Sequence, residues 1–196
     1  MAAYPDVLTD IKGTIPFNWE SNQRILKTEF ENGQESRRLV WQDPRRNLSV
    51  QYAALSFDGS RRLYNFYKDM NGPFSSFVFF FPQTVTYAKE FCGVSDGEEA
   101  GINLPSKGAQ SYTLYAGASE VSSGLYTYFV SGGPDGEDRL VFSGYTPTVG
   151  ARFYWSFTGR LKTIMRFSET AVNYSEIKNI AVAIKVNLIG LQAKLT

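Results

Sequence analysis

The chain has 196 residues, enough for one compact domain or for a small core that carries an insertion. Its 20 Lys and Arg nearly balance its 19 Asp and Glu, which argues against a protein whose main task is to grip nucleic acid. It contains no histidine and one cysteine, Cys92, so Ser-His-Asp, Cys-His and histidine-rich metal sites are excluded, as is an intrachain disulfide. We therefore expect a protein that is not an enzyme and has no cofactor and no metal, with Cys92 as a buried, inert thiol.

The beginning of the chain, residues 1–6, lacks the basic region and the apolar stretch of a secretion signal. The longest strictly apolar run, Phe77 to Phe81, is far too short to cross a bilayer. We expect synthesis and assembly in a cytoplasm, without membrane insertion.

The first part of the chain has the pattern of β-strands. A strand from Ile25 to Phe30 leads into Glu31-Asn32-Gly33-Gln34, whose Asn-Gly pair is a strong signal for a tight hairpin turn. A returning strand from about Ser36 to Trp41 follows, and Asp43-Pro44 marks a further turn. From Leu48 to Leu55, apolar and small polar residues alternate, which predicts a strand with one buried face.

One segment, from about Ser60 to Asn71, is predicted to be helical. Its apolar residues recur at helical spacing, Asp58 or Ser60 can cap its start, and Gly72-Pro73 ends it. The next strand, Phe74 to Pro82, is apolar on both faces, so we expect it to lie centrally, between the helix and other strands. The residues that form the apolar face of the helix are Leu63, Phe66, Tyr67 and Met70.

Residues 84–154 shift to short strands and glycine-rich turns, which is typical of a small β-meander. A strand is expected from Arg152 to Phe157, and further strands follow at Leu161 to Phe167 and at Ile180 to Leu188. The pattern predicts a mainly β protein: a β-sandwich or barrel-like core with one α-helix, at about 60–71, and an inserted β-meander. The core is assigned to residues 1–83 and 155–196, and the inserted module to 84–154.

Two acidic clusters, residues 96–99 and 135–138, place carboxylates close together as calcium loops do, but neither has the spacing of an EF-hand. We expect both to be solvated turns. Phosphate-binding glycine loops are lacking, and no pair of carboxylates is singled out for glycoside hydrolysis.

Three arginine doublets are more distinctive in a chain with balanced charge. Solvated surface is the plain interpretation for most of them. The functional alternative is that guanidinium groups form fixed, bidentate pairs with carboxylates of a neighbouring subunit, which arginine does better than lysine. Candidates for a subunit interface are Arg37, Arg38, Arg45 and Arg46; the third doublet is Arg61-Arg62.

The order of segments resembles that of distal tail proteins and minor tail proteins of long-tailed bacteriophages, prophages and gene transfer agents. In that family a Gly-x-Glu-x-Arg pattern is followed by Trp, by Pro-Arg-Arg, by a strand, and by a helix that ends at Gly before an aromatic strand. The middle of the chain, from Tyr112 to Phe157, is similar to a small β-module common in phage tail proteins. The matching residues of the first part are Gly33, Glu35, Arg37, Trp41, Pro44, Arg45, Arg46, Leu63, Phe66 and Gly72.

The resemblance implies a structural virion component of the tail tip, assembled in the host cytoplasm. Such a protein forms a ring with copies of itself, as a hexamer, that joins the tail tube protein to the tip or baseplate proteins. DNA passes through the channel without specific binding. The alternative from another class is a carbohydrate-binding β-sandwich used for host attachment, which would present exposed aromatic residues such as Trp19, Trp41 or Trp155 to sugars.

Overall fold

The computed structural model describes residues 2–4, 17–40, 45–98, 100–168, 173–177 and 181–191. The fold is mainly β, with 56% of residues in strands and one α-helix in the described part, which confirms the fold class. The large antiparallel sheet remains open among the described residues, so no closed barrel forms there.

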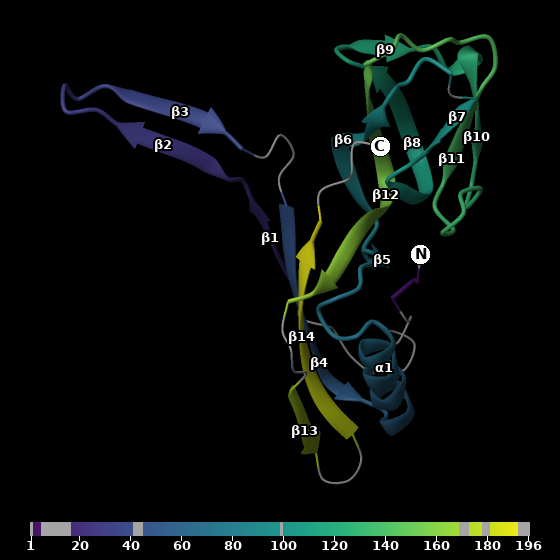
Figure 1. Cartoon of the computed structure of the whole chain (residues 1–196). Coiled ribbons are helices and arrows are strands. Elements are labelled where there is room, and N and C mark those ends of the chain that lie inside the picture. The colour runs from purple at the N-terminus through teal and green to yellow at the C-terminus, as the bar shows by residue number, and fades with distance from the viewer. Residues whose placement is uncertain are drawn as a thin grey trace. The chain divides into compact units, whose positions relative to one another are not determined.

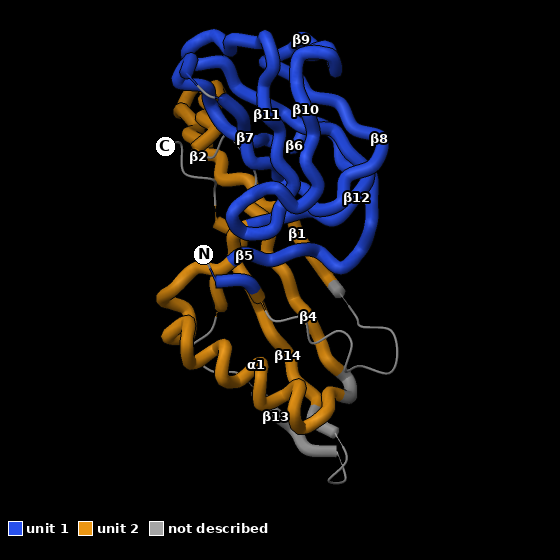
Figure 2. Tube along the Cα trace, turned by 90° about the vertical axis from the view of Figure 1, so that its right-hand side faces the viewer, with its two compact units in different colours: residues 1–3, 78–163, 193–196 blue, residues 4–77, 164–192 orange. Residues whose placement is uncertain are grey.

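The chain divides into two compact units, shown in two colours in Figure 2. Unit 1 comprises residues 1–3, 78–163 and 193–196, and unit 2 comprises residues 4–77 and 164–192. The divisions at 77/78 and 163/164 lie near the expected boundaries of the inserted module, 83/84 and 154/155, without coinciding with them. Whether the core can fold without the middle of the chain is addressed by an experiment below.

Unit 2 is built on an antiparallel sheet in which β4 (Arg45–Leu55) lies between β1 (Phe17–Asn22) and β14 (Ala181–Gly190). The other edge of β14 pairs with β13 (Asn173–Ile177) and with the end of β12 (Arg152–Phe167). The alternation expected in β4 is confirmed, because its apolar residues on one face are buried and the polar ones are more exposed. The buried residues of that face are Leu48, Val50 and Tyr52.

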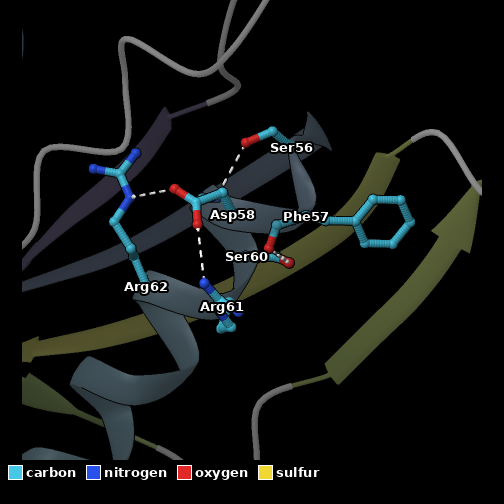
Figure 3. Close-up of polar contacts among 7 residues, drawn as sticks. Ser56, Phe57, Asp58, Ser60, Arg61 and Arg62 are labelled. Carbon is cyan, nitrogen blue, oxygen red and sulfur yellow. Dashed lines mark hydrogen bonds and ion pairs between the residues drawn. The ribbon is translucent and has the colours of Figure 1, made fainter.

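The helix α1 (Phe57–Asp69) follows β4 directly. It begins earlier than predicted, because Ser56 is its N-cap and accepts a hydrogen bond from the N–H of Gly59 at 3.0 Å. Asp58 instead pairs with Arg61 and Arg62 (Figure 3). At the other end Gly72 has a φ of +60°, and a Cβ there would lie 2.8 Å from the Tyr67 hydroxyl, so only glycine fits.

The inner face of α1 packs into an aromatic core. Phe66 lies 5.1 Å from Phe77, measured between ring centroids, and Phe77 lies 5.1 Å from Phe167 on β12. The expectation that the aromatic strand lies against the helix therefore holds for Phe77 at the start of β5 (Phe77–Phe80). It is wrong for Phe74, which is 86% exposed in the turn after the helix.

Unit 1 is a β-sandwich. One layer contains the antiparallel neighbours β6 (Val85–Val94), β12, β8 (Ser106–Ala116) and β9 (Ser119–Val121). The other contains β10 (Tyr126–Phe129), β11 (Arg139–Phe142) and β7 (Gly101–Asn103), as Figure 1 shows. The layers meet through aromatic side chains, with Phe142 lying 5.6 Å from Phe153 and Tyr128 lying 6.2 Å from Trp155.

The sequence pattern divided β12 wrongly. Two strands were expected, at 152–157 and 161–167, but the residues from Arg152 to Phe167 form one strand. The residues between the two expected strands include Gly159, where a Cβ would lie 3.1 Å from the Cα of Ala109 on β8. Glycine at this point therefore allows close approach of two strands and does not mark a turn.

The second acidic cluster is a buried network, so the expectation of a solvated turn is wrong there. Lys162 on β12 pairs with Glu137 at 2.9 Å and with Asp135 at 3.1 Å. Asp138 is fully buried, and its carboxylate accepts four hydrogen bonds. The donors are the hydroxyl of Ser106 and the backbone N–H groups of Gly108, Ala109 and Ser131.

Asp138 should anchor the turn before β11 to β8. Burial by itself raises the pKa of Asp138, but the backbone hydrogen bonds outweigh burial and leave the pKa below its ordinary value. The stabilisation is therefore present above the ordinary pKa of aspartate and is lost as the pH falls through the lowered value. Asp138→Asn should cost about 3 kcal/mol of the free energy of unfolding at neutral pH and remove this pH dependence. Urea denaturation at neutral and acidic pH, with exposed Asp96→Asn as control, tests this; equal effects of the two substitutions would contradict it.

Unit 2 should fold without the sandwich of unit 1. The N–H of Phe81 donates to the carbonyl of Leu161 at 2.8 Å, so these residues are already neighbours. Replacing Pro82 to Arg160 by a short Gly-Ser linker should leave a soluble protein that unfolds cooperatively in urea. Aggregated or non-cooperatively unfolding material would mean that the middle of the chain belongs to the main core.

Candidate interaction surface: the β2–β3 hairpin

The hairpin of β2 (Ile25–Glu29) and β3 (Glu35–Leu39) is formed as the Asn-Gly signal predicted. Gly33 has a φ of +79°, and the side chain of Asn32 accepts a hydrogen bond from the N–H of Gln34 at 3.1 Å. The N–H of Phe30 donates to the carbonyl of Gln34, which closes the turn. The turn chemistry thus lies in the local sequence.

The hairpin continues the ribbon of β1 and β4 beyond the end of the sheet. The last pair between β14 and β4 is Ile189 with Asn47, and a Cβ at Gly190 would lie 2.5 Å from the carbonyl oxygen of Arg46. Past this point β2 and β3 pair with each other and with no other strand of the described residues, and Figure 1 shows them extending past the end of β14. A two-stranded ribbon therefore leaves a multi-stranded sheet at Arg46.

Every residue from 18 to 40 is exposed, which is unusual for a segment with this many large apolar side chains. A lone two-stranded hairpin is marginally stable in water, because neither of its faces is covered. Contiguous apolar groups on such a surface indicate a site of contact with another molecule. The exposed large apolar residues of this stretch are Trp19, Ile25, Leu26, Phe30, Leu39 and Val40.

The two faces of the hairpin differ in chemistry. On the first, which we call the charged face, Lys27 lies 2.6 Å from Glu29 and 3.0 Å from Glu35, and Arg37 also pairs with Glu35. The Arg37 guanidinium, followed by Lys27, lowers the pKa of Glu35, and Glu29, followed by Glu35, raises the pKa of Lys27. These charges neutralise one another within the hairpin.

The second face, which we call the apolar face, carries Leu26, Phe30 and Val40. Leu26 pairs with Arg38 in the register of the two strands, so this arginine belongs to the same face. The N–H of Val40 donates to the carbonyl of Arg24, which extends the pairing by one step. The apolar face thus combines three exposed apolar side chains with two arginines, Arg24 and Arg38, and its chemistry fits a partner surface that is apolar with carboxylates.

The structure separates the four arginines proposed for an interface. Arg37 and Arg38 are exposed on β3, but Arg37 is paired with Glu35, whereas Arg38 has no partner among the described residues. Arg45 and Arg46 are half-buried at the base of the hairpin, opposite Asn22 and Ser21 of β1, and each interacts with other groups of the chain. They therefore brace the point where the ribbon leaves the sheet, whatever else they contact.

The tryptophans considered for sugar binding have different surroundings. Trp155 is fully buried between the layers of unit 1 and stacks on Tyr112 at 5.0 Å, so its ring cannot receive a ligand. Trp19 is 52% exposed on β1, and Trp41 lies outside the described residues.

The described part of the chain shows little sign of a metal site, a membrane-spanning helix or a reactive thiol. It holds no group of three or more Cys, Asp and Glu residues placed to bind a metal, and no helix there is long and apolar enough to cross a membrane. Cys92 is half-buried, and burial, with a smaller contribution from Glu90, raises the pKa of its thiol. An elevated thiol pKa disfavours the reactive thiolate at neutral pH.

Comparison with models of known protein families found no match to this chain, and a comparison with curated proteins found none either.

We expect Arg38→Ala to weaken self-association several-fold and to leave the free energy of unfolding unchanged within about 0.5 kcal/mol, because the side chain contacts nothing described in its own chain. Arg45→Ala with Arg46→Ala should instead lower both the association constant and the free energy of unfolding, since these side chains are half-buried and each interacts with other groups of the chain. Sedimentation velocity and urea denaturation measure the two effects side by side. A free energy of unfolding that is lower for Arg38→Ala than for the Arg45/Arg46 variant would contradict this division of roles.

Proposed function

We propose that the chain is a structural virion component, a distal tail protein of a long-tailed bacteriophage, with no catalytic activity. Copies assemble into a ring, six to a ring by resemblance to the family, which joins the tail tube to the baseplate or tip proteins. DNA passes through the channel without specific binding. Assembly takes place in the host cytoplasm, and the protein ends at the tail tip.

The observation that carries this proposal is the fully exposed hairpin with its apolar face. An enzyme or a lone binding domain has no need of a ribbon that extends beyond its sheet with uncovered leucine, phenylalanine and valine side chains. A subunit of a permanent assembly can carry such a ribbon, because a neighbouring copy covers those side chains. The charged face pairs its four charges within the hairpin, and it also leaves Ile25 and Leu39 exposed at its base.

A projecting arm also suits a ring geometrically. When the arm of each copy contacts a different surface on the next copy, the interface is head-to-tail, and repetition around an axis closes a ring if the rotation per step allows it. A two-fold dimer would place identical surfaces against each other.

The carbohydrate-binding alternative has weaker support. It needs exposed aromatic rings that can stack on sugar faces, and among the described tryptophans only Trp19 is exposed. That residue lies on β1, which leads directly into the hairpin, so an assembly interface explains its exposure equally well.

The proposal is tested by removing the arm. Arg24 and Val40 are already hydrogen-bonded neighbours, so an Asn-Gly turn can replace residues Ile25–Leu39 without disturbing the sheet. The shortened protein should be monomeric by mass photometry at concentrations where the full chain forms rings. Its free energy of unfolding in urea should be unchanged within about 0.5 kcal/mol, because among the described residues the strands of the arm pair only with each other.

A matched control is Lys27→Gln with Glu29→Gln, which neutralises part of the charged face and keeps the arm. It should still form rings. Rings of unchanged mass from the shortened protein would contradict the proposed role of the hairpin.

A further inference from the structure

A second exposed surface in unit 2 lies on the outward face of α1. Phe57, Arg61, Tyr64 and Lys68 recur at spacings of four, three and four residues, which places them within an arc of about 60° around the helix. All four are exposed, with Phe57 at 46% and Tyr64 at 45%. We call this row the helix stripe.

The helix stripe alternates aromatic rings with cations. The Lys68 ammonium lies 5.8 Å from the centre of the Tyr64 ring. Arg61 and Arg62 both pair with the carboxylate of Asp58, at 3.4 Å and 3.7 Å, as Figure 3 shows. Exposed pairs of this kind are weak and exchange readily for a better partner.

The tip of the hairpin has the complementary character. Phe30 is 53% exposed, and it is flanked by Glu29 and Glu31. Glu29 pairs with Lys27, whereas Glu31 is exposed and has no partner among the described residues. An aromatic ring between carboxylates thus faces solvent at one place in unit 2, and aromatic rings between cations do so at another.

These two surfaces cannot meet within one chain. The hairpin leaves β4 at Arg45, and α1 begins after its other end, Leu55. The 11 residues of β4 put about 35 Å between these ends, and the hairpin points away from the helix, as Figure 1 shows. Contact between them requires a second copy of the chain.

We propose that the hairpin tip of one copy docks on the helix stripe of the next copy. This inference rests on the proposed function, in which the hairpin is the assembly arm, and it names the surface that receives the arm. Phe30 inserts among the Phe57 and Tyr64 rings, and Glu31 pairs with Arg61.

The lengths of the two surfaces agree with this docking. Leu26 to Phe30 covers about 14 Å along β2, and Phe57 to Lys68 covers about 16 Å along the helix. With the tip toward the start of α1, the base of the apolar face, where Arg38 lies, falls near the end of the helix. Asp69 is exposed there without a partner among the described residues and is the carboxylate available to Arg38.

Charge reversal tests the pairing on the full chain. Glu31→Lys and Arg61→Glu should each lower the association constant at least about tenfold, because like charges then face each other. The double variant E31K/R61E should restore rings. The matched control Arg139→Glu, at an exposed position on β11, should leave association unchanged and should not rescue E31K.

Mixing the two single variants distinguishes a head-to-tail contact. The lysine tip of E31K can dock on the glutamate stripe of R61E, and the unchanged Glu31 of R61E can dock on the unchanged Arg61 of E31K. Every contact in an alternating ring is then attractive, so the mixture should form rings by mass photometry although neither variant does so alone. A mixture that forms no rings would overturn the pairing, and a mixture that stops at dimers would indicate a two-fold contact and overturn the head-to-tail proposal.

A covalent trap provides a readout that does not depend on charge. In a Cys92→Ser background, the variant Phe30→Cys with Tyr64→Cys should on oxidation produce a ladder of disulfide-linked multimers on a non-reducing gel, while each variant with one introduced cysteine stays monomeric there. A linked dimer from Phe30→Cys alone would indicate tip-to-tip contact and overturn the proposal. Wild-type protein that stays monomeric would overturn the self-assembly proposal and the docking with it, whereas wild-type rings that tolerate both reversals and give no ladder overturn the docking alone.

Discussion

The structure of unit 2 depends on one steric constraint, the end of β14 at Gly190. There the strand approaches the backbone of Arg46 so closely that a Cβ would lie 2.5 Å from its carbonyl oxygen. Because β14 accompanies β4 no further, the ribbon of β2 and β3 loses its neighbour and both of its faces are left in water. The unpaired edge of the ribbon and the partial burial of Arg45 and Arg46 at its base both follow from this strand ending.

The two units bury their apolar side chains in different ways. Unit 2 places one amphipathic helix and an aromatic cluster on one face of a sheet, whereas unit 1 packs two small sheets against each other. Unit 1 also buries charge, which is stable only because Lys162 pairs with Glu137 and Asp138 receives four hydrogen bonds. Such buried carboxylates fix one arrangement of the turn before β11, and this explains why an acidic cluster that resembles a cation site serves the fold.

Arginine plays three distinct parts in unit 2. Arg37 completes a charge cluster within the hairpin, Arg61 and Arg62 share Asp58 on the helix, and Arg45 and Arg46 sit partly buried in the sheet. Arg38 differs, because its guanidinium lies on an apolar face without a carboxylate in the described part of the chain. An exposed charge beside apolar side chains suits an interface in which the partner supplies the counter-charge.

The sequence by itself determined what depends on local chemistry: the hairpin turn at Asn32-Gly33, the alternation in β4, the helix, and the absence of histidine-based catalysis. It could not decide that 152–167 is one strand, since Gly159 reads as a turn residue until the approach of Ala109 is known. It could not distinguish a solvated from a buried acidic turn, because the partner Lys162 lies far along the chain from Glu137 and Asp138. Nor could the sequence show which of the four arginines are exposed and which are half-buried, because their sequence surroundings are alike. Burial, strand endings and pairing between distant residues are set by packing, and only the tertiary structure decided them.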